Sequence, residues 1–167
     1  WVWEQPNYSK QYIVVADVSR GDGTDYSATQ VFEIGDMVQC AEYKGKLSTT
    51  DYGHFLIDLA TRYNDAILVV ENNNIGWATI QTIIDRGYKN LFYQSKDLKY
   101  VDVEHQINNK YRTQDKGMVA GFSTTMKTKP LIIAKMEEYT REKLVKLHSN
   151  RLIDELFVFI YKTGITN

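Results

Sequence analysis

The fold is decided by residues 12–18, which read Tyr12-Ile13-Val14-Val15-Ala16-Asp17-Val18. A run of β-branched apolar residues such as this one is typical of a buried β-strand. The next residues, 19–25, are rich in Gly, Asp and Ser and predict a turn. Two further strands are expected at about 27–34 and 37–44, with a Gly-Asp turn between them. Three consecutive strands with short connections predict an antiparallel meander.

Beyond the meander the chain changes to helical periodicity. Apolar side chains recur at helical spacing over residues 50–63, and Ser48, Thr49 or Thr50 can cap the start of this helix. The apolar run Ala66–Glu71 then predicts another buried strand. A helix that joins two buried strands is a crossover, so this strand should lie parallel to a strand of the meander.

The second half of the chain is expected to complete a mixed sheet. A helix at about 75–86 and a short strand at 91–93 precede residues 94–117, which are mostly polar and predict an exposed loop or hairpin. The remaining elements are a helix from Thr124, a short strand at Leu144–His148, and a helix from Asn150 to about Phe157 that Ser149 can cap. This order predicts one α/β domain with helices on both faces of a mixed sheet.

The composition limits the classes of protein to which the chain can belong. The 167 residues are 43% hydrophobic and 25% charged, which is typical of a folded domain. A net charge of −1 argues against reliance on bulk positive charge but allows a basic rim around an acidic centre. Cys40 is the single cysteine, which excludes an intrachain disulfide and a cysteine-based zinc site. With no apolar run long enough for a bilayer and no signal-peptide pattern, we expect a soluble intracellular protein.

Two acids at the ends of apolar strands are the candidate site. Asp17 interrupts the first strand, and Glu71 ends the run that begins at Ala66. An isolated carboxylate in an apolar strand is costly, and two on neighbouring strands also repel each other. A divalent cation such as Mg²⁺ or Mn²⁺ would resolve both problems, because such ions prefer oxygen ligands. The alternative is that each acid is only a solvated residue at a strand end.

Other candidates have less support. The scattered residues His54, His105 and His148 lack the short spacings of metal ligands. Gly21 and Gly23 are not followed by the Gly-Lys-Ser/Thr of a P-loop, so no ATPase motor is expected in this chain. Basic residues that could hold DNA phosphates, with an ordinary solvated surface as the alternative, are Lys96, Lys99, Lys110, Arg112, Lys116, Lys127 and Lys129.

Several segments, taken in order, resemble the nuclease domain of the large terminase subunit of tailed (T4-like) bacteriophages. Residues 12–27 resemble its first motif, in which an Asp on the first strand precedes a glycine-bearing turn and an Asp-Tyr-Ser sequence. Residues 69–76 resemble the second motif, an acidic strand end that leads through Asn into a Gly-started helix. Gly121–Thr125 with Lys129–Leu131, and then Arg151–Leu156, resemble later segments of the family. The likeness covers nearly the whole chain.

This resemblance implies an RNase H-like fold and a metal-dependent endonuclease that cuts concatemeric double-stranded viral DNA during genome packaging. It assigns Asp17 and Glu71 as the first two catalytic metal ligands in a two-metal site for Mg²⁺ or Mn²⁺. Asp25 matches a recurrent acid and is a candidate auxiliary ligand, with a turn Asp that binds backbone amides as the equal alternative. The implied partners are double-stranded DNA, the terminase ATPase domain, the small terminase and the portal, in the host cytoplasm and not in the virion or a membrane.

The family also has a third catalytic Asp, which we expect beyond Asn167. Asp154 and Glu155 match a helical segment away from the metals and are interpreted as solvated helix residues. The chain begins at Trp1 without an initiator Met. We therefore expect a single nuclease domain that is a C-terminal fragment of a larger motor protein, lacking its ATPase domain and its own C-terminal end.

Two alternatives stay open. The chain could be another RNase H-like nuclease, resolvase-like or integrase-like, which substrate preference among linear, branched and hybrid nucleic acids would identify. It could instead be a catalytically silent module that binds DNA or packaging partners, a reading that the missing third acid motivates.

Overall fold

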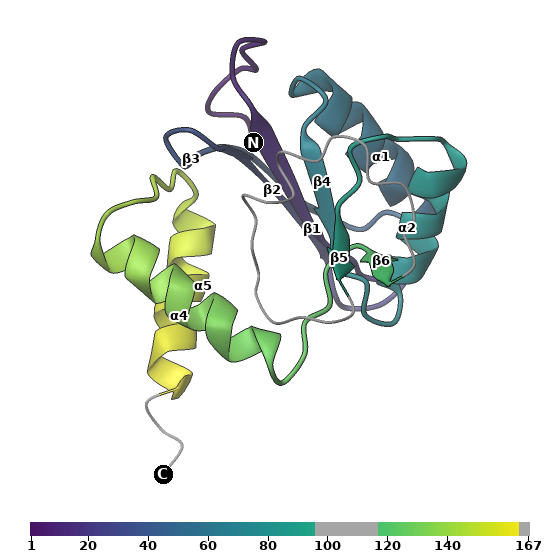
Figure 1. The fold of residues 1–167 in the computed structure, drawn as a ribbon. Coiled ribbons are helices and arrows are strands. Elements are labelled where there is room, and N and C mark those ends of the chain that lie inside the picture. Colours follow the sequence, from purple (N-terminus) through teal and green to yellow (C-terminus); the bar gives the residue numbers. More distant parts are fainter. Residues whose placement is uncertain (96–116, 164–167) are drawn as a thin grey trace.

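The computed structural model describes residues 1–95 and 117–163. Its main sheet has four strands in the order β3-β2-β1-β4 (Figure 1). The strands are β1 (Tyr12–Asp17), β2 (Ser27–Glu33), β3 (Val38–Gly45) and β4 (Ile67–Val70). β1, β2 and β3 form an antiparallel meander, and β4 runs parallel to β1. The predicted meander and the predicted parallel fourth strand are both confirmed.

A second, two-stranded sheet adjoins the edge of β4. It consists of β5 (Tyr93–Ser95) and β6 (Met118–Ala120), which are antiparallel. Isolated parallel bridges from Leu68 to Leu91 and from Glu71 to Phe122 join the flanking residues to β4 and its end. The strand expected at 91–93 therefore begins two residues later, although the backbones of Asn90 and Phe92 already bond to Leu68 of β4.

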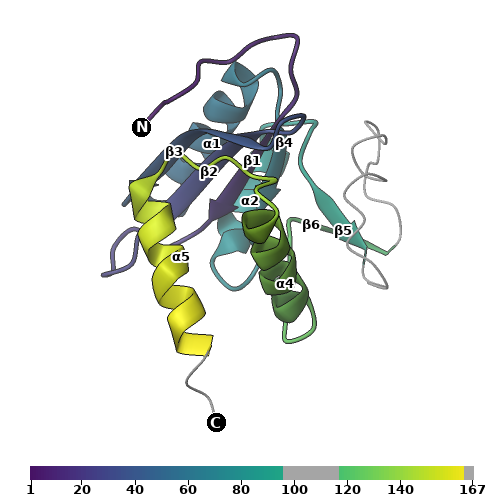
Figure 2. The same ribbon diagram turned by 90° about the vertical axis from the view of Figure 1, so that its left-hand side faces the viewer.

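Helices lie on both faces of the sheet, as predicted. Figures 1 and 2 show α1 (Thr49–Arg62) and α2 (Gly76–Asp85) on one face, with α4 (Thr128–Arg141) and α5 (Asn150–Thr163) toward the other. Ser48 caps α1, because its side chain accepts a hydrogen bond from the Asp51 N–H at 3.1 Å. Among the described residues no helix combines the length and apolar character that a bilayer crossing needs.

The core fills the space between the sheet and the first two helices. Alternate residues of the strands face it, and its buried side chains include Val14, Ala16, Val31, Leu68 and Val70 from the sheet, and Tyr52, Leu56, Ile80 and Ile83 from the helices. The Tyr52 hydroxyl donates to the Ala28 carbonyl at 2.8 Å, so the one polar atom of this ring is satisfied.

The opposite face holds α5 through a polar network rather than an apolar one. Gln39 is fully buried, and its Oε1 accepts the backbone N–H groups of His148 and Ser149, both at 2.8 Å. The buried Glu42 carboxylate accepts from Ser149 Oγ at 2.7 Å and from Arg151 at 2.8 Å. The first turn of α5 is thereby fixed to β3.

Two sequence predictions about this region were wrong. The strand expected at Leu144–His148 is reduced to one bridge, between Lys146 and Val38. The last helix does not end near Phe157 but continues to Thr163. Ser149 does cap it, accepting from the Leu152 N–H at 3.1 Å. The segment before α5 is held by Gln39, which satisfies its backbone without a second strand and which local sequence does not reveal.

Candidate active site

Asp17 and Glu71 lie side by side at the carboxyl end of the two central parallel strands. Asp17 is the last residue of β1, and Glu71 directly follows β4. Ala16 pairs with Val70 in parallel register, and the Glu71 N–H donates to the Ala16 carbonyl at 2.9 Å. The next pair in this register is Asp17 and Glu71, so both side chains project from the same face. This face is the one turned away from α1 and α2.

The two carboxyl groups affect each other directly. The pKa of Asp17 is raised to about 6, first because neighbouring atoms desolvate its carboxyl, then because it shares a hydrogen bond with Glu71 and feels that charge. The residue itself stays open to solvent at the end of the strand. Two carboxylates in this position repel each other, and a bound cation would relieve that repulsion. The pair therefore has the electrostatic character of a cation-binding site.

Glu71 is held in place by the residue two positions later. The Asn73 side-chain amide donates to Glu71 Oε1 at 3.0 Å and to the Thr124 carbonyl at 3.0 Å. One amide thus connects the acid to the segment that follows β6. Because the amide nitrogen has two hydrogens, it can make both bonds at once.

Behind this contact is a buried polar network that joins the two sheets. The Asn72 side chain donates to the Ala120 carbonyl at 2.9 Å and accepts from Ser123 Oγ at 2.8 Å. The Ser123 N–H donates to Gln94 Oε1 at 2.6 Å, and Asn72 and Gln94 are both buried. The backbone of Phe122 bonds to β4 on one side, donating to the Val70 carbonyl at 2.8 Å. These hydrogen bonds hold the end of β4 that bears Glu71, although the Nε2 atom of Gln94 is buried without a hydrogen-bond partner among the described residues.

Two glycines permit the close packing around the acids. At Gly76, a Cβ would lie 1.8 Å from the Glu71 carbonyl oxygen, so α2 can start against the strand end only without a side chain. Gly121 has φ +78°, and a Cβ there would lie 2.4 Å from the Val70 carbonyl oxygen. Both positions require glycine for steric reasons, and both lie in the segments that the sequence singled out.

Asp25 lies in the turn that precedes β2. Its backbone carbonyl accepts from Ser19 Oγ at 3.2 Å, and the Ser19 N–H donates to Ser27 Oγ at 3.0 Å, so the two ends of the turn are tied together. Asp25 is exposed, and its charge is the smallest contribution that raises the Asp17 pKa. Within residues 1–95 and 117–163, no group of three or more His, Cys, Asp or Glu side chains could hold a metal ion. The role of Asp25 as an auxiliary metal ligand stays a prediction.

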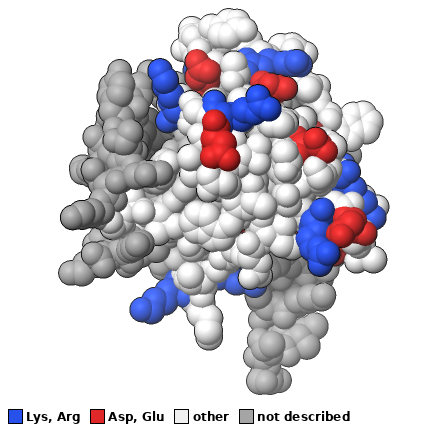
Figure 3. Space-filling model, turned by 90° about the vertical axis from the view of Figure 1, so that its right-hand side faces the viewer, with Lys and Arg blue, Asp and Glu red and all other residues white. Residues whose placement is uncertain are grey.

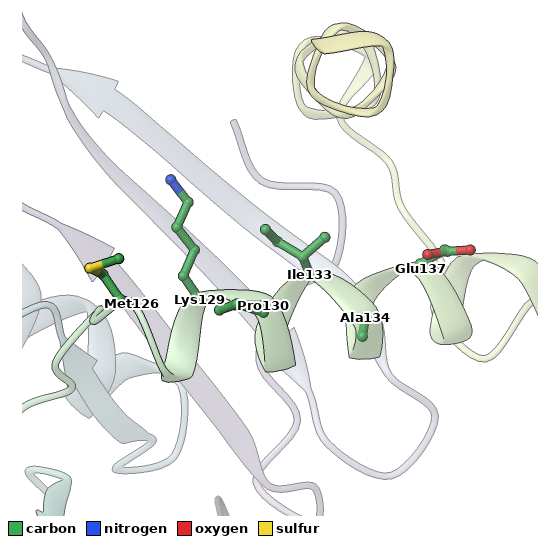
Figure 4. Close-up of a pocket in the computed structure, with 6 residues that line it drawn as sticks. All are labelled: Met126, Lys129, Pro130, Ile133, Ala134 and Glu137. Carbon is green, nitrogen blue, oxygen red and sulfur yellow. The ribbon is translucent and has the colours of Figure 1, made fainter. Parts of the chain in front are cut away.

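The basic residues proposed for DNA divide into two sets. Lys127 and Lys129 are exposed at the start of α4, where Lys129 lines a shallow hollow of about 390 Å³ (Figure 4). Its lining comes from α4 and the residues just before it: Met126, Lys129, Pro130, Ile133, Ala134 and Glu137. The hollow includes neither Asp17 nor Glu71. The remaining basic residues lie outside the described residues: Lys96, Lys99, Lys110, Arg112 and Lys116.

The other sequence candidates lie away from the acids. His54 is in α1, and His148 stacks on Trp3 with ring centroids 5.8 Å apart; His105 is outside the described residues. Asp154 and Glu155 are exposed on α5, as expected, although Glu155 also contacts Lys44 and Arg151. Sequence reasoning missed Asn73 and Ser123 as supports of the acid-bearing loop. The available signals were the run of three Asn after Glu71 and the position of Ser123 in the segment Gly121–Thr125.

No family model and no curated protein matches the chain. Several solved structures, however, do match the chain. The magnesium-bound large terminase nuclease of thermophilic phage G20c superposes with a TM-score of 0.66 and 16% identity, covering 93% of this chain and 67% of that chain. The chain has the fold of a phage large terminase nuclease. The cobalt-bound form of the G20c nuclease superposes with a TM-score of 0.66 and 15% identity, over 93% of this chain and 67% of that one.

A second phage gives the same result for this terminase nuclease fold. The nuclease domain of the Thermus phage P74-26 large terminase superposes with a TM-score of 0.59 and 16% identity, covering 93% of this chain and 65% of that domain. This chain thus spans about two thirds of the length of the domains it matches. The sequence-based prediction of an RNase H-like mixed sheet is confirmed, and what is shared at this identity is the fold.

Proposed function

We propose that this chain is a divalent-metal-dependent endodeoxyribonuclease of the terminase type, which cleaves concatemeric double-stranded viral DNA during packaging. The observation that carries the proposal is the position of Asp17 beside Glu71 at the carboxyl end of parallel strands, with the Asp17 pKa raised to about 6. The terminase nuclease fold adds support, since two of its structural neighbours hold magnesium or cobalt.

The residues present fit a divalent cation. Two adjacent carboxylates supply oxygen ligands and two negative charges, and a bound cation would relieve the repulsion that helps to raise the Asp17 pKa. When bound, such an ion polarises a phosphate and lowers the pKa of a water molecule. Asp17 and Glu71 would hold the ion, and Asn73 keeps the Glu71 carboxylate oriented through its bond to Oε1. Asp17 and Val15 are exposed on the sheet face turned away from α1 and α2, here called the open face, so a phosphate backbone can reach the acids from this side.

Finer parts of the proposal follow from the resemblance. A two-metal site would need ligands besides these two acids, and Asp25 is the described acid whose charge also acts on Asp17. The expected third catalytic Asp would be the other source. The partners we propose are double-stranded DNA, the terminase ATPase domain, the small terminase and the portal, in the host cytoplasm. Little sequence preference is expected, because nothing in the sequence resembles a base-reading helix.

Plasmid nicking in Mn²⁺ tests the proposal. Asp17→Asn and Glu71→Gln keep the shape of each side chain and remove its charge, so cleavage should fall to background in both variants. Asp58→Asn, at an exposed acid of α1, is the matched control and should cut like the parent chain. Thermal unfolding by circular dichroism checks that all three variants are folded. Full cleavage by both site variants would reject the assigned site.

One observation favours a second candidate, a catalytically silent DNA-binding or partner-binding module. Within the described residues no cluster of three metal-ligating side chains is present, and two acids alone make a weak site. A silent module would bind duplex DNA without cutting it in Mg²⁺, Mn²⁺ or Co²⁺. Cleavage of linear duplex by the parent chain that Asp17→Asn abolishes would exclude it, whereas cleavage of branched substrates alone would indicate a resolvase-like enzyme.

A further inference from the structure

The residues that face the same side of the sheet as Asp17 include a lysine at the end of its own cross-strand row. Asp17 pairs with Ala28, and Ala28 pairs with Lys44 on the next strand. Residues that pair directly across antiparallel strands project from the same face. The row therefore runs Lys44, Ala28, Asp17, Glu71 across the open face. Two strand spacings separate Lys44 from Asp17, which is roughly 10 Å between their Cα atoms.

A second lysine and an exposed aromatic ring adjoin Lys44. Tyr26 directly precedes β2 and is 50% exposed. The Nζ atom of Lys46 lies 4.9 Å from the centroid of its ring, and that of Lys44 lies 5.5 Å from it. Cation–π contact holds both ammonium groups near one point at the site end of the sheet. This pre-arrangement lowers the entropy cost of binding an anion there.

The charges around this pair leave it able to bind an anion. Glu155 of α5 is the carboxylate in contact with Lys44, at 3.4 Å, and it also contacts Arg151 at 3.1 Å. Both partners of the Lys44–Glu155 pair are substantially exposed, so the pair is weak and can exchange. No carboxylate is described in contact with Lys46 within residues 1–95 and 117–163. Lysine ammonium groups of this kind are common ligands of phosphate.

The side of the molecule on which α1 and α2 lie has a different distribution of charge among the described residues. Figure 3 shows that the side on which α1 and α2 lie has a broad central area without charged side chains, with Lys, Arg, Asp and Glu grouped near its margins. Acidic and basic groups are mixed at those margins. A phosphate backbone bound to the acid-bearing face would instead meet Lys44 and Lys46 about three base-pair rises of 3.4 Å from Asp17.

We propose that Lys44, Lys46 and Tyr26 form a phosphate-binding surface that guides a DNA strand across the open sheet face to Asp17 and Glu71. This inference rests on the proposed function, and it assigns the substrate contact to the β2–β3 side of the acids. Glu155 competes with the DNA phosphate for Lys44. The surface is distinct from the basic residues that the sequence alone suggested.

The test is binding of a fluorescently labelled duplex, followed by anisotropy at several salt concentrations. EDTA withholds the cation, so only binding is measured. Lys44→Ala/Lys46→Ala should lower the slope of log Kd against log salt by about 1.8 and raise Kd roughly 10- to 100-fold at 0.1 M salt. The matched control is Arg86→Ala/Lys89→Ala, which removes the same charge at the end of α2 and should have a clearly smaller effect.

Two further variants separate this surface from a general charge effect. Tyr26→Ala removes the ring that holds both ammonium groups and should weaken binding several-fold, whereas Tyr26→Phe keeps the ring and should bind like the parent chain. Glu155→Gln removes the competing carboxylate and should tighten binding. A parent chain that does not bind duplex, or a lysine double variant that matches its control, would overturn the proposal.

The outcome is independent of the nuclease assignment. If the lysine double variant binds DNA normally while Asp17→Asn abolishes cleavage, the proposed phosphate-binding surface is rejected and the proposed nuclease function is supported. If the lysine double variant loses binding while Asp17→Asn and Glu71→Gln still cut DNA, the surface stands and the assigned catalytic site falls.

Discussion

The face of the sheet that α1 and α2 cover is closed and apolar, whereas the face toward α4 and α5 is polar and partly open. Successive residues of one strand belong to different faces: Ala16 is 2% exposed and Val15 is 41% exposed. The closed face buries the apolar side chains that stabilise the fold. The open face bears Asp17, Glu71, Lys44 and the network around Gln39. Because side chains alternate along a strand, one short strand contributes both to the buried core and to the candidate site.

The largest expected difference in stability between the two faces is at two neighbouring residues of β4. Leu68 is fully buried on the closed face, and Val69 is only partly buried on the other. Leu68→Ala should lower the free energy of unfolding by about 3 kcal/mol, because it leaves a cavity in the core. Val69→Ala should cost about 1 kcal/mol or less. Urea denaturation of both variants measures the difference, and equal losses would break the distinction between the faces.

The polar attachment of α5 predicts a somewhat smaller effect. Gln39→Ala leaves the N–H groups of His148 and Ser149 without their buried acceptor and should cost about 2 kcal/mol. It should also speed proteolytic cleavage between α4 and α5, since this segment is then less well held. Gln81→Ala, at an exposed residue of α2, is the control and should change neither quantity. Unchanged proteolysis in the Gln39 variant would show that α5 is held by other contacts.

The contact between Asn73 and Glu71 should affect cation binding more than stability. Asn73→Ala removes the amide that bonds to Glu71 Oε1 and should weaken Mn²⁺ binding about tenfold, which is typical when a residue that orients a ligand is lost. Isothermal titration calorimetry measures the affinity, and the midpoint of thermal unfolding without metal serves as the control. A large fall in that midpoint with unchanged Mn²⁺ affinity would make Asn73 a structural residue only.

The effect of pH on the free energy of unfolding should be smaller than the effects of the substitutions above, since Asp17 is open to solvent. Folding raises its pKa to about 6 from 3.8, so the folded chain binds this proton more tightly than the unfolded chain. The contribution to stability is therefore complete below about pH 4 and is lost as the pH rises through 6. Relative to Asp17→Asn, which stays neutral, the parent chain should lose stability between pH 4 and 6.5 and then run level. A constant difference across this range would contradict the raised pKa.

The local sequence predicts the elements of the first half well. The β-branched run of β1, the change to helical spacing in α1 and the apolar run of β4 each follow from residues close in the chain. A crossover helix then requires β4 to be parallel to a strand of the meander. The observed strand order β3-β2-β1-β4 places Asp17 beside Glu71, whereas the sequence predicted this pair only on the condition that their two strands are neighbours.

The remaining features depend on contacts between distant parts of the chain. The register across β1, β2 and β3 aligns Lys44 with Asp17, and local sequence does not fix that register. The β-bulge between Val31 and Phe32 also shifts the pairing. Gln39 replaces the expected strand at Leu144–His148, because one side chain can satisfy two backbone groups 109 and 110 residues away. No pattern in the local sequence predicts that a side chain will accept the backbone hydrogen bonds of a distant segment.

Mn²⁺ titration at pH 7.5 tests the central claim most directly. Calorimetry of the parent chain should show a cation site, and both Asp17→Asn and Glu71→Gln should lose at least about tenfold in affinity because each removes one of two charged ligands. Asp58→Asn should bind like the parent chain. If the parent chain binds no Mn²⁺, or if either site variant binds it as tightly as the parent, the two acids do not hold the cation.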